Sequence, residues 1–185
     1  IREPKRVQWI RKNIELDKRK KFDTVERLQI LKKISQATLF EEFLQKKFIG
    51  QKRFSLEGGE SLIPALDTLI EQGTKNGVKE VVIGMAHRGR LSTLAHILGK
   101  SYRDIFSEFQ GKDFEGDDNL EGDVKYHLGH SCTRKTDSDN EVAITLAPNP
   151  SHLEAVDPVV LGISRARIDE RGGDENAVLP ILVHG

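Results

Sequence analysis

The sequence predicts an α/β protein, with a parallel sheet covered by helices and a basic helical segment in front of it. Three observations carry this prediction. The chain has 185 residues, enough to bury a core, and 37% of them are hydrophobic. From residue 50 onward, short apolar runs alternate with segments of helical periodicity, an order typical of a parallel sheet. Residues 1–49 instead place positive charges between apolar residues at helical spacing.

The segment 1–49 carries 14 Lys and Arg against 7 Asp and Glu, whereas residues 50–185 carry 15 against 22. A basic segment is one signature of nucleic-acid binding. The regular spacing of its apolar residues favours a solvated helical face instead, so we expect no nucleic-acid partner. We predict two or three helices that pack on a surface outside this segment. The apolar positions of this pattern are Val7, Ile10, Ile14, Leu28, Leu31, Leu39, Phe40, Phe43 and Leu44.

The first elements after residue 50 are a helix and a strand. Ser61 is a suitable N-cap for an amphipathic helix over 61–70, and Pro64 falls in its first turn. Gly73 is expected to end this helix. The apolar run Glu80–Met85 predicts a buried strand. Two more helices are expected over 91–98 and 102–109.

The second half of the region repeats this alternation. Val142–Leu146 predicts a second strand. Ser151–Glu154 is a capping box, a Ser followed three residues later by Glu, and predicts a helix that begins there. The Asp-Pro pair at 157–158 restarts this helix, which we expect to run toward Arg167 and to end before Gly172 and Gly173. Val178–Val183 predicts a third strand.

In such sheets, ligands bind beyond the carboxyl ends of the parallel strands. The loops to inspect therefore follow Met85, Leu146 and Val183. Each of them contains a histidine: His87, His152 and His184. Histidines gathered at one edge of a sheet indicate a polar cleft that handles protons.

The loop after the first strand reads Ala-His-Arg-Gly-Arg over residues 86–90. Gly89 lets the backbone turn, and Arg88 and Arg90 present guanidinium forks suited to carboxylate or phosphate. The start of the following helix adds N–H groups at its positive end. The motif is equally compatible with an anion site and with a surface turn whose arginines pair with acids.

Two other segments are compatible with a site and with a purely structural role. His127 lies between an aromatic and an apolar residue, where a histidine is more often packed than catalytic, although the flanking glycines favour close approach by the backbone. Pro148–Leu153 is stiffened by two prolines, which suits either a ligand-holding loop or a rigid connection. Nothing around Cys132 indicates an activated thiol.

Several function classes are excluded. The longest apolar run, Ala177–Val183, is far shorter than the roughly 20 residues that span a bilayer, so no membrane protein is expected. One cysteine excludes a disulfide scaffold and a four-thiolate zinc site. The glycine patterns of dinucleotide and P-loop sites are absent, as is the zinc-hydrolase motif. Because the chain begins at Ile1 and ends directly after an apolar strand, we expect it to be a piece of a longer protein.

The most specific motifs are four ordered stretches: Gly50–Pro64, Val82–Leu91, Gly122–Gly129 and Ala147–Val160. Together they resemble the thiamin-diphosphate-dependent dehydrogenase component of 2-oxoglutarate dehydrogenase, over residues 27–185. The resemblance implies that residues 50–185 are the first part of a thiamin-diphosphate-binding domain, truncated at the C-terminus.

Members of this family decarboxylate 2-oxoglutarate on thiamin diphosphate and pass a succinyl group to the lipoyl arm of a partner acyltransferase, in the tricarboxylic acid cycle. The resemblance therefore implies a homodimeric enzyme with thiamin diphosphate and Mg²⁺ as cofactors. Its implied partners are the dihydrolipoyl succinyltransferase and dihydrolipoyl dehydrogenase components. The implied compartment is the bacterial cytoplasm or the mitochondrial matrix.

The resemblance also assigns six site residues. They are the cofactor-binding Arg88, Ser151 and Leu153, the substrate-binding His127, and the catalytic His87 and His152. Within this set, Arg88 matches the position that contacts the cofactor's diphosphate. The two catalytic histidines match positions that bind the oxoacid or move protons around the cofactor.

The family's metal ligands begin directly after the pair that matches His184 and Gly185. No metal ligand is therefore expected in this chain, and the chain alone is expected to be inactive. Two residues depart from the family pattern, Pro148 and Ala86, and neither departure removes a chemical group.

Two alternatives stay open. The same chemistry could act on a longer oxoacid such as 2-oxoadipate, because the residues that line the pocket lie partly outside this chain. The chain could also be a non-enzymatic anion-binding or docking module, with the basic segment as its docking element.

Overall fold

The computed structural model describes residues 3–16, 21–110, 126–150 and 152–184. The chain divides into two compact units, residues 1–31 and residues 32–185. The domain boundary expected after residue 49 stays a prediction.

The first unit is helical, as its sequence pattern predicts. It contains α1 (Pro4–Arg11), a π-helical turn (Lys12–Leu16) and the beginning of α2 (Thr24–Lys47). Pro4 stands in the first turn of α1, where its missing N–H costs nothing. At the start of α2, Asp23 and Glu26 each accept a hydrogen bond from the other's backbone N–H, at 2.8 and 3.0 Å, which is a capping box.

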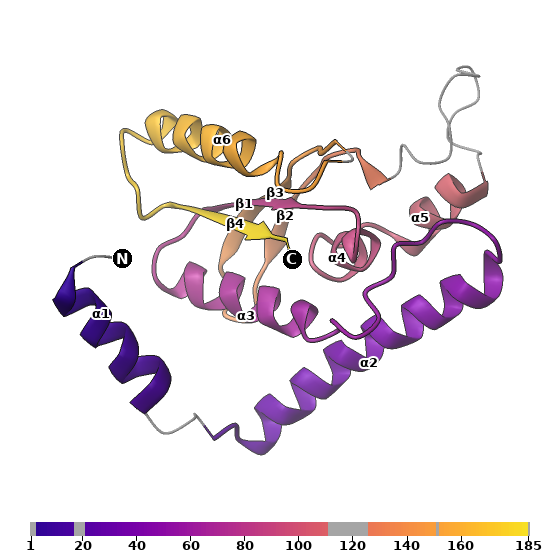
Figure 1. The fold of residues 1–185 in the computed structure, drawn as a ribbon, viewed down its shortest axis with the longest axis horizontal. Helices are drawn as coiled ribbons and strands as arrows, with labels where there is room; N and C mark the ends of the chain where they lie inside the picture. Colours follow the sequence, from indigo (N-terminus) through magenta and orange to yellow (C-terminus); the bar gives the residue numbers. More distant parts are fainter. Residues whose placement is uncertain (1–2, 17–20, 111–125, 151, 185) are drawn as a thin grey trace. The chain divides into compact units, whose positions relative to one another are not determined.

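The second unit holds a four-stranded sheet in the order β2-β3-β1-β4 (Figure 1). Its strands are β1 (Glu80–Met85), β2 (His130–Lys135), β3 (Glu141–Leu146) and β4 (Val178–Val183). The strands β3, β1 and β4 are parallel to one another, and they are the three strands that the sequence predicts. The α/β class is therefore confirmed.

The edge strand β2 departs from the expected parallel arrangement, because it runs antiparallel to β3. Its residues alternate between half-buried and exposed positions, so it lacks the continuous apolar run that marks the other strands. A tight turn joins it to β3, in which the Thr136 N–H donates to the Asn140 carbonyl at 2.8 Å and Asp139 has φ 68°. A hairpin needs no crossover helix, so this strand falls outside the alternation of strands and helices that the sequence shows.

Helices cover both faces of the sheet. One face packs on α3 (Leu62–Lys75), α4 (Arg90–His96), α5 (Tyr102–Gln110) and the C-terminal half of α2, whereas α6 (Asp157–Glu170) covers the other (Figure 1). The strand β1 serves both layers, since Val81 and Ile83 join the first core and Val82 joins the second. This period of two is what a strand buried on both faces requires.

Two helix ends differ from the sequence-based expectation. Gly73 lies inside α3, which continues to Lys75 before the chain turns at Gly77 with φ 97°. The capping box at 151–154 does not start a helix, because Glu154 takes a left-handed φ of 64° that an α-helix excludes. The helix begins instead at Asp157, at the expected Asp-Pro pair.

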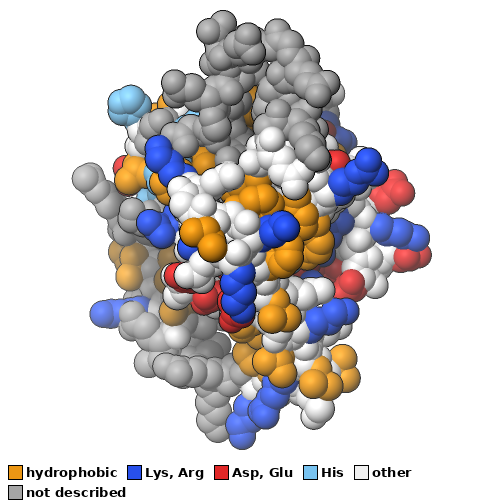
Figure 2. Space-filling model, turned by 90° about the vertical axis from the view of Figure 1, so that its right-hand side faces the viewer, with side chains coloured by type: hydrophobic (Ala, Val, Ile, Leu, Met, Phe, Trp, Pro, Cys, Tyr) orange, Lys and Arg blue, Asp and Glu red, His pale blue; other side chains and the backbone are white. Residues whose placement is uncertain are grey.

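Part of the apolar surface of α2 stays exposed. Figure 2 shows hydrophobic side chains in the middle of one face, bordered by charged ones. The helices α2 and α5 form a shallow groove there of about 360 Å³, lined by Gln36, Leu39, Phe40, Phe43, Tyr102 and Phe106. Phe40 is buried at its base, whereas Leu39 is 64% exposed. No helix among the described residues is both long and apolar enough to cross a membrane.

The contact between β1 and α6 depends on Gly84. A Cβ at this position would lie 2.5 Å from Cγ2 of Val160, a fully buried and stiff side chain.

Replacing Gly84 with Ala should lower the free energy of unfolding by about 1–3 kcal/mol, as overpacking does in other cores. Chemical denaturation measures this value. Gly162→Ala is the matched control: it lies on exposed α6 surface with open space around it, and it should raise stability by about 0.5–1 kcal/mol. Equal effects of the two substitutions would contradict the close-packing argument.

Candidate active site

The carboxyl ends of the three parallel strands meet at one edge of the sheet. Met85 of β1 is opposite Val183 of β4, and Ile83 is opposite Leu146 of β3. The ladder continues one residue further, since the Ala147 N–H donates to the Ile83 carbonyl at 2.9 Å. The loops that follow these strands therefore start at the same edge, where the sequence predicts a site.

Arg90 lies beneath this edge with its side chain fully buried. Its guanidinium donates to three backbone carbonyls, those of Met85 at 3.3 Å, Leu128 at 2.6 Å and Ala147 at 2.8 Å. Burial lowers the pKa of Arg90 to about 10, so the group stays charged at neutral pH. The expectation that Arg90 presents a fork to an anion is wrong, because the protein's own carbonyls occupy that fork.

His87 lies against an aromatic cluster at the same edge. The ring centroid of Phe54 is 4.1 Å from that of His87 and 4.9 Å from that of Tyr126. The Tyr126 hydroxyl donates to the Lys52 carbonyl. Phe54 has φ 44°, a conformation that bulky residues rarely adopt and that the surrounding packing must enforce. Phe54 therefore joins the loop after β1 to the segment that carries His127.

The loop after β1 also packs closely on residues 54–56. Gly89 has φ 75°, and a Cβ there would lie 2.5 Å from Cδ1 of Leu56. The Gly89 N–H donates to the Phe54 carbonyl at 2.9 Å. The Leu56 N–H in turn donates to Oε1 of Glu41, a buried carboxyl of α2. This glycine is needed for both its backbone conformation and its lack of a side chain.

Arg88 is the exposed arginine of the motif. Its Nη1 donates to the Ser55 carbonyl at 3.3 Å, and within the described part of the chain no carboxylate forms an ion pair with it. An exposed guanidinium with donors to spare suits an anionic group such as a diphosphate. This geometry favours the anion-site interpretation of Arg88 over a surface turn paired to acids.

His127 is half-buried and held in one orientation. Its Nδ1 lies 3.0 Å from the Asn149 carbonyl oxygen, and the Asn149 N–H donates to the His127 carbonyl at 3.1 Å. A carbonyl only accepts, so Nδ1 must carry the proton and Nε2 is the acceptor in the neutral ring. His127 can therefore accept a proton at Nε2, or donate one from it when charged.

The remaining predicted residues lie on the connection from β3 to α6. His152 and Leu153 are exposed, and Leu153 is 58% accessible to solvent. Ser151 lies outside the described residues. His184, after β4, faces the same connection: its Nδ1 is 3.5 Å from Oε1 of Glu154, and its Nε2 is 3.8 Å from Oδ2 of Asp157.

The structure thus brings the loops of His87, Arg88 and His127 together through Phe54 and Arg90. No contact of this kind joins His152 or Leu153 to them among the described residues. Their placement near that cluster stays a prediction.

Phe54, Tyr126 and Asn149 also contribute to this edge, although no sequence pattern predicts these three residues as site residues. Asn149 stands between two prolines and is 7% exposed, and its Oδ1 is buried without a hydrogen-bond partner among the described residues. The sequence Pro-Asn-Pro could have indicated this role of Asn149, because an Asn between two prolines has few accessible conformations. Phe54 gave no signal, since its role depends on residues far away in the chain.

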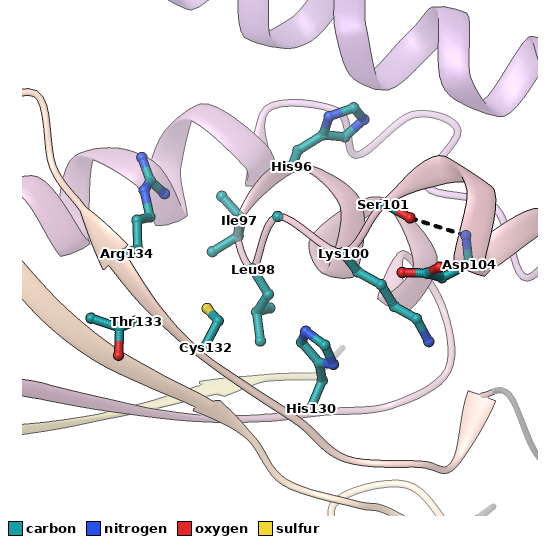
Figure 3. Close-up of a pocket in the computed structure, with 11 residues that line it drawn as sticks. His96, Ile97, Leu98, Lys100, Ser101, Asp104, His130, Cys132, Thr133 and Arg134 are labelled. Carbon is teal, nitrogen blue, oxygen red and sulfur yellow. Dashed lines mark hydrogen bonds between the residues drawn. The ribbon is translucent and has the colours of Figure 1, made fainter.

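A separate pocket of about 610 Å³ lies between β2 and the connection from α4 to α5 (Figure 3). Its cations are already paired, Lys100 with Glu108 and Arg134 with Asp67. Burial raises the pKa of the Cys132 thiol, the opposite of what an activated nucleophile needs. Burial, followed by the charge of Lys100, also lowers the pKa of His130. None of the site residues that the sequence predicts lines this pocket.

Within the described ranges, no three His, Cys, Asp or Glu side chains gather in a group that could hold a metal ion.

The chain is similar to known proteins over its whole length. No protein-family model matches the chain. It is 48% identical over 190 residues to the multifunctional 2-oxoglutarate metabolism enzyme of Mycolicibacterium vanbaalenii. It is 46% identical over 197 residues to the 2-oxoglutarate dehydrogenase E1 components of Brucella ovis and Brucella abortus.

The chain is homologous to part of the 2-oxoglutarate dehydrogenase E1 component. Each match covers 100% of this chain, but only 15% of the Mycolicibacterium enzyme and 20% of the Brucella proteins. The resemblance seen in the four motifs is confirmed. The relatives are named as enzymes, and this E1 homologue spans about a fifth of their length or less.

The carboxyl of Glu41, which supports the turn at residues 54–56, makes stability depend on pH. Burial raises its pKa above the ordinary 4.5, and Glu57 and Glu60 add to this, whereas Leu56 and Arg53 oppose it. The folded state therefore keeps this proton to higher pH than the unfolded chain does. The stability that the protonated form contributes is lost as pH rises through the raised pKa.

Glu41→Gln removes this titration while keeping an oxygen for the Leu56 N–H. The melting temperature of the variant minus that of the parent should therefore become more positive as pH rises from the ordinary pKa of 4.5 through the raised pKa of Glu41. Thermal unfolding monitored by circular dichroism measures the difference. Gln45→Ala, at an exposed position of the same helix, is the control: it removes no titratable group, so its difference should not change with pH. A flat difference for Glu41→Gln would show that the carboxyl titrates normally.

Proposed function

We propose that this chain belongs to an enzyme that decarboxylates 2-oxoglutarate on thiamin diphosphate and transfers the succinyl group to the lipoyl group of a partner acyltransferase. The observation that carries the proposal is the 46–48% identity over the whole chain to proteins named for 2-oxoglutarate metabolism. The loops that carry His87, Arg88 and His127 meet at the carboxyl edge of the sheet, which supports the proposal, because an anionic cofactor and an anionic oxoacid need cations and movable protons.

Thiamin diphosphate supplies the carbanion chemistry that loss of carbon dioxide from a 2-oxoacid requires. The residues present fit its anionic end, since Arg88 is exposed at the site and has donors beyond the one on Ser55. We infer that Arg88 binds the diphosphate and that Ser151 and Leu153 line the cofactor. The Mg²⁺ that accompanies the diphosphate takes its protein ligands, on this proposal, from residues beyond Gly185.

His127 is proposed to bind the oxoacid through Nε2. Because Nδ1 donates to the Asn149 carbonyl, only Nε2 is left to face a substrate. The protonated ring presents an N–H at this atom, and that donor suits a substrate carboxylate. His87 and His152 are proposed to bind the oxoacid or to move protons at the reacting carbon, since imidazole exchanges protons readily near neutral pH.

The further proposals concern assembly. The active enzyme is a homodimer that works with dihydrolipoyl succinyltransferase and dihydrolipoyl dehydrogenase, in the bacterial cytoplasm or, in a eukaryote, the mitochondrial matrix. The name E1 component of the relatives denotes one part of such a multienzyme complex. The 185 residues alone are expected to lack activity, because the metal ligands and the partner subunit's share of the site lie elsewhere.

The test uses the full-length protein that contains this chain. We expect reduction of an artificial electron acceptor that requires 2-oxoglutarate, thiamin diphosphate and Mg²⁺ together, and succinylation of an added lipoyl domain, which mass spectrometry detects. Turnover with 2-oxoadipate alone would move the substrate to the longer oxoacid. Absence of cofactor-dependent turnover with either acid, in a folded protein, would favour the docking-module alternative.

Two substitutions separate cofactor binding from oxoacid handling. Arg88→Ala should weaken thiamin diphosphate binding about tenfold or more, as loss of a charged hydrogen bond does, and calorimetry measures this. His127→Ala should instead lower kcat/KM for the oxoacid about tenfold or more, with little change in cofactor affinity.

Arg165→Ala, an exposed arginine of α6, is the control and should change neither quantity. If His127→Ala abolished cofactor binding but spared the oxoacid step, the role proposed for His127 would be wrong.

A further inference from the structure

Arg90 is a buried cation in a position that an apolar side chain could fill at lower cost. Its neighbours Leu91 and Leu94 on α4 are buried hydrophobic residues. Among the described residues it pairs with no carboxylate, and its Nε has no hydrogen-bond partner. Taking a guanidinium out of water costs free energy, and well-packed apolar replacements of buried charges are often neutral or stabilising. The charge at Arg90 therefore has another use than filling space.

That use is visible in its hydrogen bonds. The same nitrogen, Nη2, donates to the Leu128 and Ala147 carbonyls at 2.6 and 2.8 Å, and Nη1 donates to the Met85 carbonyl at 3.3 Å. Leu128 lies 38 residues from Arg90, and Ala147 lies 57 residues from it. One planar group thus joins the end of β1, the segment after Tyr126 and the end of β3.

The two shortest of these bonds hold the two segments that position the His127 ring. Leu128 follows His127 directly, and Ala147 precedes Asn149, whose carbonyl orients the His127 ring. These segments touch without side chains between them. A Cβ on Gly129 would lie 3.0 Å from both the Leu146 carbonyl oxygen and Cδ of Pro148. A shift of either segment is therefore passed to the other.

We propose that Arg90 is a positioning residue for the oxoacid-binding histidine: by clamping the Leu128 and Ala147 carbonyls, it holds the His127 segment against the Pro-Asn-Pro loop. The hydrogen bond from His127 Nδ1 to the Asn149 carbonyl depends on the distance between these two segments. The direction in which Nε2 points therefore depends on the same distance. This inference rests on the proposed role of His127 in oxoacid binding. Arg90 touches neither cofactor nor substrate in this account, and it acts through His127 alone.

Arg90→Lys separates charge from geometry. The ammonium keeps the positive charge, but it cannot reproduce the planar fork that reaches both sides. In the full-length protein, kcat/KM for 2-oxoglutarate should fall about 10- to 100-fold, the size that a misplacement of about 1 Å produces. The dissociation constant of thiamin diphosphate, measured by calorimetry, should change less than about threefold, since the bond toward the Arg88 loop is the longest of the three.

A double-mutant cycle tests whether the effect passes through His127. In a His127→Ala background, Arg90→Lys should change kcat/KM by less than about twofold, because the ring that it aims is gone. Arg134→Lys is the matched control: this partly buried arginine pairs with Asp67 away from the site. It should lower the melting temperature and leave kcat/KM unchanged in both backgrounds. The proposal is overturned if Arg90→Lys leaves kcat/KM unchanged, as the control does. It is also overturned if Arg90→Lys lowers kcat/KM by the same factor with and without the His127 ring.

Hydrogen exchange followed by mass spectrometry gives a readout that needs no turnover. Arg90→Lys should speed exchange in peptides from residues 126–150, which include the Asn149 N–H bonded to the His127 carbonyl, and leave α6 peptides at the parent rate. Unchanged exchange at 126–150 in a folded variant would contradict the clamp. Because this measurement uses no oxoacid, it separates failure of the clamp from failure of the proposed function, which shows as absence of cofactor-dependent turnover in the parent.

Gly129→Ala provides a second variant if Arg90→Lys does not fold. The added methyl would lie 3.0 Å from the Leu146 carbonyl oxygen and from Cδ of Pro148, at the same junction. It should lower kcat/KM for the oxoacid and lose this effect in the His127→Ala background. An effect of Gly129→Ala that is equal with and without His127 would overturn the proposal.

Discussion

The edge of the sheet where the site lies is organised around one buried guanidinium. Two backbone carbonyls at the ends of parallel strands, those of Met85 and Ala147, point toward this guanidinium together with the carbonyl of Leu128. All three need hydrogen-bond donors. Water could satisfy them, but an edge filled with water would not define where each loop goes. Arg90 supplies several N–H groups in one rigid plane, and the charge strengthens each bond. The loops that carry His87, Arg88 and His127 take their positions from this arrangement.

The neighbouring packing adds close backbone contacts to the hydrogen bonds of Arg90. Gly89 admits Leu56 and the turn at 54–56, and this turn presents Phe54 between His87 and Tyr126. Phe54 adopts a left-handed backbone conformation in doing so, and tertiary contacts must outweigh the strain. The candidate site is thus assembled from segments distant in sequence, joined by close backbone contacts and by the side chains of Arg90 and Phe54.

The two arginines of one motif illustrate how burial decides chemistry. Arg88 and Arg90 are two residues apart and carry the same group. Arg88 is exposed and has N–H donors for an anion, whereas Arg90 is buried and donates to backbone carbonyls. The aromatic groove on α2 and the pocket beside β2 lie apart from the sheet edge where these arginines lie.

The sequence by itself determined the strands at 80–85, 142–146 and 178–183, the helix from Asp157 and the meeting of three loops at one edge, because local periodicity and caps specify these elements. Its four long motifs also carried the resemblance to 2-oxoglutarate dehydrogenase E1 components. Only the tertiary structure decided that β2 pairs antiparallel, that Glu154 stops a helix before Asp157, and that Arg90 binds carbonyls instead of an anion. The hydrogen-bond partners of Arg90 include carbonyls 38 and 57 residues away in the chain. A local sequence pattern does not predict where such a distant carbonyl points.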